Sequence, residues 1–229
     1  MAAKVRRRIE RGGERFWRLR DFPDLPPSAV ARTLARLADE GVLERARRGL
    51  YYRPRETRLG MSIPSATAVA AESLRAPLQP AGLTAANLLG FSTQNPAISE
   101  FVTPANNPPG VLTRAKVKTR RPEARFRLSE REGALLELLR GRASDSDLSF
   151  DETHRRLLRL LREGETYRRL ARAALDEPPR VRAMLGALGQ ELGADEQLLL
   201  KLRKSLNPLS RYEFGPLSRL PYAREWQAK

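Results

Sequence analysis

Three side chains that can hydrogen-bond to a nucleic acid recur at helical spacing near the start of the chain. Ser28, Arg32 and Arg36 are four residues apart, so a helix over 27–41 would place them on one outer face. Arginine binds guanine bidentately and contacts phosphates, and small neighbouring side chains would let such a helix approach a groove closely. The residues expected to contact DNA from this helix are Ser28, Ala29, Arg32, Thr33 and Arg36. The alternative is an ordinary amphipathic surface helix with a solvated arginine face.

The segment that carries these side chains has both helix ends marked. Pro27 suits the first position of a helix, where its missing N–H is no loss, and Gly41 suits the left-handed residue that ends one. Between them, Val30, Leu34 and Leu37 form a narrow apolar stripe that can pack on a small core. The sequence therefore predicts an amphipathic helix with an exposed polar face.

A basic hairpin is predicted directly after this helix. Two short β-prone runs flank a basic turn that ends at Gly49, a residue that can take the positive φ of a tight turn. A helix followed by a hairpin with a basic tip is the order of a winged helix-turn-helix, whose wing lies along the DNA backbone. The predicted wing contacts are Arg45, Arg47, Arg48, Gly49, Tyr51 and Arg53.

The first 58 residues contain enough further elements for a winged-helix domain. A helix over 4–11, a short strand over 14–17 and a short helix over 19–25 precede the predicted recognition helix. The formal net charge of the whole chain is +16, and residues 1–60 carry sixteen Lys and Arg against eight Asp and Glu. Such a charge indicates a polyanionic partner. We therefore predict a DNA-binding domain over 1–58 and a linker over 59–64.

Residues 65–229 are predicted to form a second domain, with a small sheet and several helices. One strand is expected near 100–104 and two more within 111–126, and Ser129 and Ser149 each begin a capping box that starts a leucine-rich helix. The apolar tail near the end of the chain is expected to pack back on this domain or on a partner. The predicted fold class is α+β and helix-rich, with an N-terminal winged helix-turn-helix followed by a C-terminal α+β domain.

A second basic surface is predicted on one strand of this domain. Positive residues alternate with uncharged ones along 113–120, so a strand would gather the charges on one face. The residues assigned to this surface are Arg114, Lys116, Lys118, Arg120 and Arg121. Two interpretations stay open: a solvated face neutralised by acidic neighbours, and a binding surface for DNA, RNA or an acidic protein.

The sequence contains few side chains of the kinds that catalyse reactions or bind metals and cofactors. It has no cysteine and one histidine, His154, which excludes thiolate metal sites and leaves few nucleophile–base pairs. Asp145 and Asp147 have the i, i+2 spacing of some metal-binding strands, but they lie between two predicted helices. We predict no catalytic residue, metal or cofactor. A basic start without an apolar run and the lack of a membrane-spanning stretch predict a cytoplasmic location.

The order of two motifs resembles a known family. The wing motif Arg-Gly-Leu-Tyr-Tyr-Arg-Pro at 48–54, followed by Ala-Gly-Leu-Thr-Ala-Ala-Asn-Leu-Leu-Gly at 81–90, resembles the AbiE-type (AbiEi) antitoxins of bacterial type IV toxin–antitoxin systems. The resemblance covers roughly the first 130 residues. It implies an abortive-infection repressor that binds double-stranded DNA repeats in its own promoter and counters a nucleotidyltransferase-like toxin encoded nearby. It also implies that a basic surface of the second domain assists DNA binding.

Two other classes of function remain as alternatives. The chain could be an RNA-binding protein, or an adaptor for an acidic protein partner, with the basic strand at 114–120 as the contact surface. Competition by tRNA would reveal the first, and co-purification with a neighbouring gene product would reveal the second.

Overall fold

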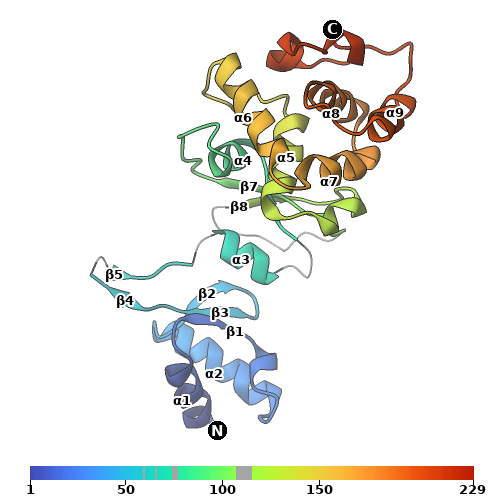
Figure 1. The fold of residues 1–229 in the computed structure, drawn as a ribbon. Helices are drawn as coiled ribbons and strands as arrows, with labels where there is room; N and C mark the ends of the chain where they lie inside the picture. Colours follow the sequence, from blue (N-terminus) through green and yellow to red (C-terminus); the bar gives the residue numbers. More distant parts are fainter. Residues whose placement is uncertain (59, 65, 74–76, 107–114) are drawn as a thin grey trace. The chain divides into compact units, whose positions relative to one another are not determined.

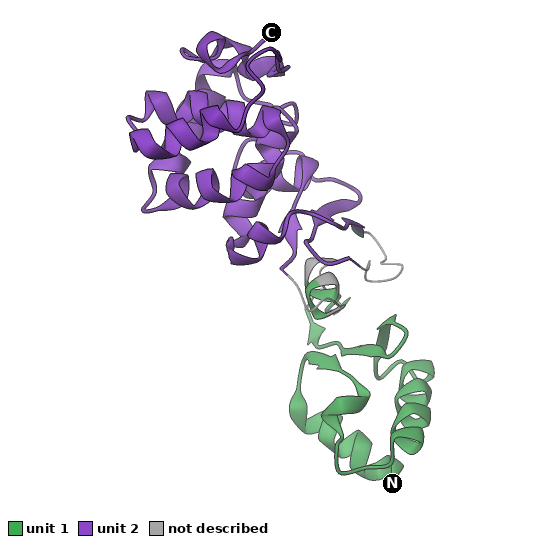
Figure 2. Ribbon diagram, turned by 90° about the vertical axis from the view of Figure 1, so that its right-hand side faces the viewer, with its two compact units in different colours: residues 1–75, 109–115 green, residues 76–108, 116–229 purple. Residues whose placement is uncertain are grey.

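The computed structural model of the protein describes residues 1–58, 60–64, 66–73, 77–106 and 115–229. It is an α+β protein, which confirms the predicted fold class (Figure 1). The chain divides into two compact units, Met1–Arg75 with Pro109–Ala115 and Ala76–Pro108 with Lys116–Lys229 (Figure 2). The first unit extends past the linker predicted at 59–64, because a second hairpin and a helix follow the wing.

The first unit begins with the elements of a winged helix-turn-helix, in the predicted order. They are α1 (Ala2–Gly12), β1 (Arg15–Trp17), the 3-10 helix η1 (Leu19–Asp21), α2 (Pro27–Asp39), β2 (Glu44–Arg47) and β3 (Leu50–Arg53). Strand β3 lies between β1 and β2 and pairs antiparallel with both. The elements that follow are β4 (Glu56–Thr57), β5 (Gly60–Met61) and α3 (Ala66–Ser73).

Helix α2 has the ends and the apolar stripe that the sequence predicts. It begins at Pro27 and is followed by Gly41, whose φ is 74°. Val30, Leu34 and Leu37 are fully buried in a core to which α1 and β1 also contribute, and that core includes Trp17. Since burying a large aliphatic side chain contributes about 1.5–3 kcal/mol, this stripe fixes which face of α2 points outward.

The second unit combines a three-stranded sheet with a larger group of helices. The sheet has the order β6 (Gln79–Pro80), β7 (Ser99–Val102), β8 (Ala115–Lys118). The longer helices are α4 (Gly82–Leu88), α5 (Glu130–Arg140), α6 (Phe150–Arg162), α7 (Thr166–Ala173), α8 (Pro179–Glu191) and α9 (Glu196–Lys204). The 3-10 helices are η2 (Glu123–Arg127), η3 (Ala174–Asp176), η4 (Gly215–Arg219) and η5 (Arg224–Trp226). Helices α4 and α5 pack on the sheet and on each other.

Both predicted capping boxes are confirmed. Ser129 and Ser149 accept a hydrogen bond from the backbone N–H three residues on, and the side chains of Glu132 and Glu152 accept one from the serine backbone in return. The second strand predicted within 111–126 is wrong. Residues there form η2, where Arg125 turns into the core to meet two buried carboxylates.

The tail packs back on the second unit, which is one of the two expected arrangements (Figure 1). Trp226 is 1% exposed, and its indole N–H donates to the side chain of Gln190 at 2.7 Å. It lies so close to α8 that a side-chain carbon on Gly186 would come within 2.1 Å of the indole ring. The core of the second unit is therefore completed by a residue from the tail.

Candidate nucleic-acid interface

The outer face of α2 presents most of the predicted contact residues. Ser28, Arg32 and Arg36 are exposed and Ala29 is half-buried. The Arg32 Nε donates to the carbonyl of Ser28 at 3.4 Å, which is a long and weak hydrogen bond. Arg36 lies 3.4 Å from Glu40, in an exposed i, i+4 pair of the kind that contributes little stability. Both guanidinium groups are thus positioned on the surface with few restraints.

The prediction is wrong for one residue of this face, Thr33. Thr33 is 7% exposed, and its hydroxyl donates to the carbonyl of Ala29 at 2.8 Å. A step of about 100° beyond Arg32 carries Thr33 onto the side of the helix that also buries Val30 and Leu34. Thr33 therefore belongs to the core side of α2.

The hairpin turn has the predicted form. Arg47 pairs with Leu50 across a two-residue turn, and Gly49 in that turn has a φ of 77°. Arg48 and Gly49 are exposed at the tip, while Arg47 is half-buried. Arg45 is exposed on β2, and its guanidinium lies 5.7 Å from the centre of the Tyr51 ring. The wing therefore exposes Arg45 and Arg48.

Two residues predicted as wing contacts, Tyr51 and Arg53, do not point to the outside of the wing. Tyr51 is 5% exposed and packs in the core of the first unit, because β3 is the central strand of its sheet. Arg53 turns away from the wing and donates to the carbonyl of Ile9 at 2.8 Å and also to that of Glu10. These carbonyls belong to the end of α1, where helical partners are lacking and a positive charge is favoured. Arg53 therefore caps α1.

Replacing Arg53 with alanine is expected to lower the free energy of unfolding of the first unit by about 1–2 kcal/mol, since hydrogen bonds from a charged donor are lost. Hydrogen exchange of peptides from α1 in the full chain would measure the loss. The control is Arg48→Ala at the exposed tip, for which a change within about 0.5 kcal/mol is expected. Equal losses in the two variants would contradict the capping role.

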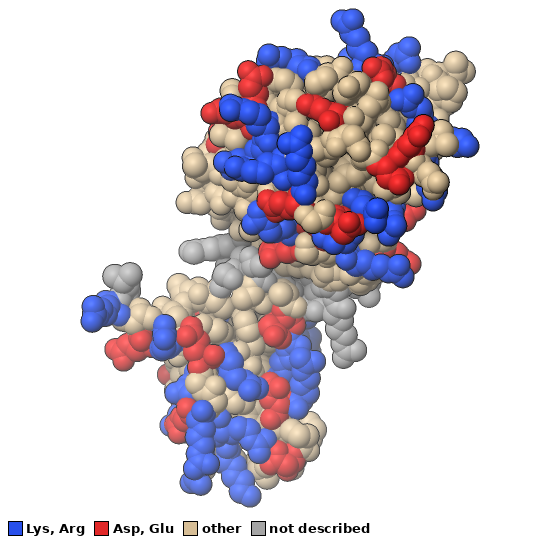
Figure 3. Space-filling view, in the orientation of Figure 1, with Lys and Arg blue, Asp and Glu red and all other residues tan. Residues whose placement is uncertain are grey.

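A group of basic residues on α1 was not assigned by the sequence. Lys4, Arg7 and Arg11 recur at i, i+3 and i+7, and with Arg15 of β1 they line a groove of about 460 Å³. Lysine and arginine side chains gather over α1 and α2 in the lower part of Figure 3. The signal that could have identified the α1 residues is this spacing, which puts basic side chains on one stripe opposite Val5 and Ile9.

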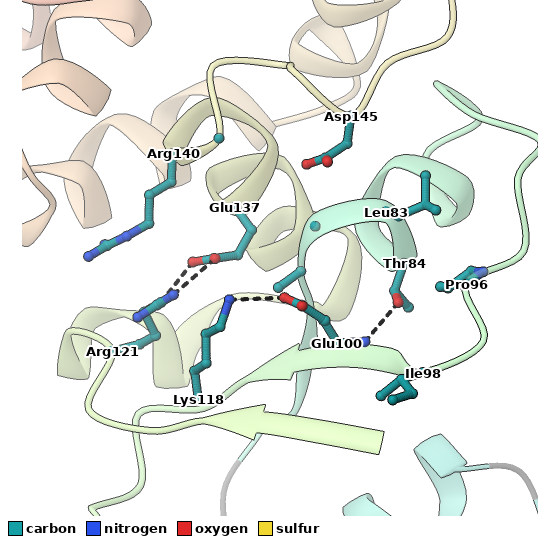
Figure 4. Close-up of a pocket in the computed structure, with 13 residues that line it drawn as sticks. Leu83, Thr84, Pro96, Ile98, Glu100, Lys118, Arg121, Glu137, Arg140 and Asp145 are labelled. Atoms are coloured by element: carbon teal, nitrogen blue, oxygen red, sulfur yellow. Dashed lines mark hydrogen bonds and ion pairs between the residues drawn. The ribbon is translucent and has the colours of Figure 1, made fainter. Parts of the chain in front are cut away.

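The predicted basic strand lies in the second unit. Lys116 and Lys118 are exposed while Ala115 and Val117 are half-buried, so the alternation is confirmed where the chain is described. The Lys118 Nζ lies 2.9 Å from a carboxylate oxygen of Glu100, on the neighbouring strand β7 (Figure 4). Arg120 is exposed, with a φ of 61°, and Arg114 lies outside the described residues.

Arg121 is not part of an exposed basic surface. Its side chain is 14% exposed and makes two hydrogen bonds to the Glu137 carboxylate, at 2.8 and 3.1 Å (Figure 4). Burial alone would raise the pKa of Glu137, but the hydrogen bond from Arg121 and the charge of Arg125 lower it. Acidic neighbours thus neutralise Lys118 and Arg121, which is the first of the two interpretations. Lys116 and Arg120 remain as exposed cations.

A pocket of about 480 Å³ between α4, β7 and α5 is lined by both charged pairs, Lys118 with Glu100 and Arg121 with Glu137 (Figure 4). Asp145 faces it, and burial together with nearby Glu100 raises the pKa of the Asp145 carboxyl. Asp147 points elsewhere and accepts hydrogen bonds from Ser92 and Gln94. The two aspartates therefore do not converge as a metal site would require. Across the described ranges, no group of three acidic, histidine or cysteine residues is placed to hold a metal ion.

His154 is held by a single acidic partner. Its Nε2 lies 2.8 Å from a carboxylate oxygen of Glu191, and its ring stacks on Phe150. The side chain is 15% exposed and therefore partly buried. This environment supports a packing role between α6 and α8.

The fold and this surface define a two-unit α+β protein with a winged helix-turn-helix topology at its start. Residues 9–108, less than half of the chain, match a family model described as "Family of unknown function (DUF6088)". A similar solved structure is that of RV2827C protein from Mycobacterium tuberculosis. It is 16% identical, with a TM-score of 0.55, and the likeness covers 98% of this chain and 88% of that chain. At this identity the likeness concerns the fold alone.

One comparison gave no match. No curated protein matches the sequence. Among the helices of the described residues, none has the length and apolar character that crossing a membrane requires.

Proposed function

We propose that the protein is a non-enzymatic, sequence-specific DNA-binding regulator. The observation that carries the proposal is the outer face of α2, where Ser28, Arg32 and Arg36 are exposed in a winged helix-turn-helix topology. In such a topology the second helix enters the major groove, where arginine can distinguish guanine from other bases. The exposed wing arginines, Arg45 and Arg48, would contact phosphates on either side of that groove.

The charges of the first unit support this proposal. Arg32, Arg45 and Arg48, on α2 and the wing, are exposed and have no ion-pair partner among the residues that the structure describes. When an unpaired surface cation binds a phosphate, counterions that were condensed on the DNA are released, and this release contributes a large share of DNA affinity. The overall charge of +16 acts in the same direction over longer distances.

The sequence motifs extend the proposal to a biological role. By their resemblance to AbiE-type antitoxins, we propose that the protein represses its own promoter and counters a nucleotidyltransferase-like toxin encoded beside it. The two activities can be separated by Arg32→Ala with Arg36→Ala, which removes two cations from α2. This variant should lose repression of a promoter fusion and should still rescue growth when the toxin is co-expressed.

Binding to the protein's own promoter, against a scrambled duplex, tests the DNA-binding role. If six to ten phosphates are neutralised, affinity should fall by about 10³ to 10⁵ between 50 and 200 mM salt. Fluorescence anisotropy of labelled duplexes would measure both salt dependence and preference. A flat salt response, or equal affinity for the two duplexes, would contradict the proposal, and stronger competition by tRNA than by promoter DNA would favour RNA as the partner.

A further inference from the structure

The groove between α1 and β1 has a strong excess of positive charge. Its lining contains five basic side chains and one acidic one, Asp21, around an aromatic floor. The basic residues are Lys4, Arg7, Arg8, Arg11 and Arg15. They lie in the first unit but not on the α2 face assigned to DNA above.

Only part of this charge is neutralised within the chain. Arg8 makes two hydrogen bonds with the Asp24 carboxylate, at 2.6 and 2.8 Å, so its guanidinium is occupied. Arg15 lies 3.6 Å from Asp21, beyond hydrogen-bonding distance. Arg7 and Arg11 are exposed and have no ion-pair partner in the described ranges. The groove therefore retains cations that an external anion can neutralise.

The floor of the groove is a buried indole ring against which a guanidinium group stacks. Trp17 is 2% exposed, and the Arg15 guanidinium stacks 4.1 Å from the centre of its ring. Gly12 lies against the same indole, where a side-chain carbon would come within 2.3 Å of the ring. The indole N–H of Trp17 is buried and has no acceptor among the described residues. A ligand rich in acceptor oxygens fits these surroundings.

The length of the basic stripe matches a run of phosphates. The stripe formed by Lys4, Arg7 and Arg11 extends over seven residue steps of α1, or about 10 Å at 1.5 Å per residue. One strand of duplex DNA advances about 3.4 Å per phosphate along the helix axis, so the stripe faces roughly three phosphates. An extended polyanion can therefore neutralise all three basic side chains at once, whereas a single small anion cannot.

The stripe and the recognition face point in different directions. Val5 and Ile9 of α1 pack in the same core as Val30 and Leu34 of α2. The Arg7 side of α1 is opposite its apolar side, and the polar face of α2 is likewise opposite its own. Two helices that turn their apolar sides to a shared core expose faces that diverge. A straight duplex seated on α2 would therefore not lie along the α1 groove.

We propose that the α1 groove binds the phosphate backbone of a second DNA duplex, so that one chain bridges two DNA segments. This inference rests on the proposed function, which assigns the first duplex to α2 and the wing. Contacts to the second duplex are made with phosphates alone and are independent of its sequence.

A capture assay with the full chain tests the bridge. Promoter duplex is immobilised, protein is added, and capture of a labelled duplex of unrelated sequence is measured. Arg7→Ala with Arg11→Ala should reduce capture about tenfold and lower its salt slope by about two, since two phosphate contacts are lost. Affinity for the promoter duplex alone should stay within about twofold, because those contacts are not made to it.

Two further variants keep the result interpretable. Lys201→Ala with Lys204→Ala removes the same number of positive charges from two exposed positions of α9, and it should leave capture unchanged. Arg7→Lys with Arg11→Lys keeps the charge, and it should restore most of the capture if the alanine variant fails to fold.

Several outcomes would overturn the bridge. One is a wild-type protein that prefers its promoter and yet captures no second duplex, and another is capture of duplex RNA in preference to DNA. The Arg7→Ala, Arg11→Ala variant would also overturn it by capturing as much as the wild type, or by losing promoter binding as strongly as it loses capture. Unchanged capture would assign bridging to association between protein copies. A wild-type protein with no preference for its promoter would instead contradict the proposed function, so the two failures are distinguishable.

Discussion

Replacing Glu177 with alanine is expected to lower the free energy of unfolding of the second unit by about 3–5 kcal/mol, because buried arginines lose their counterion. The Glu177 side chain is 0% exposed and accepts hydrogen bonds from Arg125 at 2.6 Å and from Arg140 at 2.7 Å. Arg125 is itself 0% exposed, and its other ionic partner is Glu137 at 2.8 Å. Without Glu177, one carboxylate would face several guanidinium groups in a poorly solvated site.

Urea unfolding of the full chain, with hydrogen exchange of α5 and α8 peptides, would measure this loss. The pKa of Arg140 is already lowered by burial and by the charge of Arg121, so the site tolerates added positive charge poorly. The control is Glu165→Ala, which breaks an exposed pair with Arg168 and should change stability by less than about 1 kcal/mol. A Glu177 variant as stable as this control would show that the network is dispensable.

Replacing Arg32 with alanine should weaken promoter binding by about 1–3 kcal/mol and relax the preference at one base position. Arg32 is exposed on the outer face of α2, and among the described residues its side chain makes one hydrogen bond, the weak one to the Ser28 carbonyl. Its removal should therefore leave the fold intact. Anisotropy titrations of promoter variants, each with one substituted base pair, would locate the position that loses discrimination.

The matched variant for Arg32 is Arg48→Ala at the wing tip. A phosphate contact carries no sequence information, so this change should weaken promoter and scrambled duplexes alike and lower the salt slope by about one. If both variants affected the two duplexes equally, neither α2 nor the wing would be the reading element.

The elements that could be predicted from sequence are those whose signals are local. The proline and glycine at the ends of α2, the glycine of the wing turn and both serine capping boxes act within a few residues. Ser28, Arg32 and Arg36 were placed on the outer face correctly because helical periodicity alone separates them from Val30 and Leu34. No distant partner is needed for these assignments.

Thr33 was misplaced by a single step of helical periodicity, but the other wrong assignments depend on partners that are distant in sequence. Arg53 finds carbonyls at the end of α1, more than forty residues earlier. Tyr51 is buried because β1 supplies the second neighbour of its strand. Arg121 pairs with Glu137 on α5, and Arg125 pairs with Glu177, which follows η3. The turn of Arg125 into the core is also the reason that the chain forms η2 where a strand was predicted. Residue type identified these side chains as cations, but only the fold shows which of them are already paired.

The position of Trp226 in the core has a consequence for synthesis on the ribosome. Every residue of the core of the first unit lies before residue 52, whereas the core of the second unit stays incomplete until Trp226 has been made and has left the exit tunnel. Domains fold as units and N-terminal ones fold first during synthesis. The basic winged unit can therefore fold while the second unit is still a nascent chain with exposed leucines, which is the period when chaperone protection matters most.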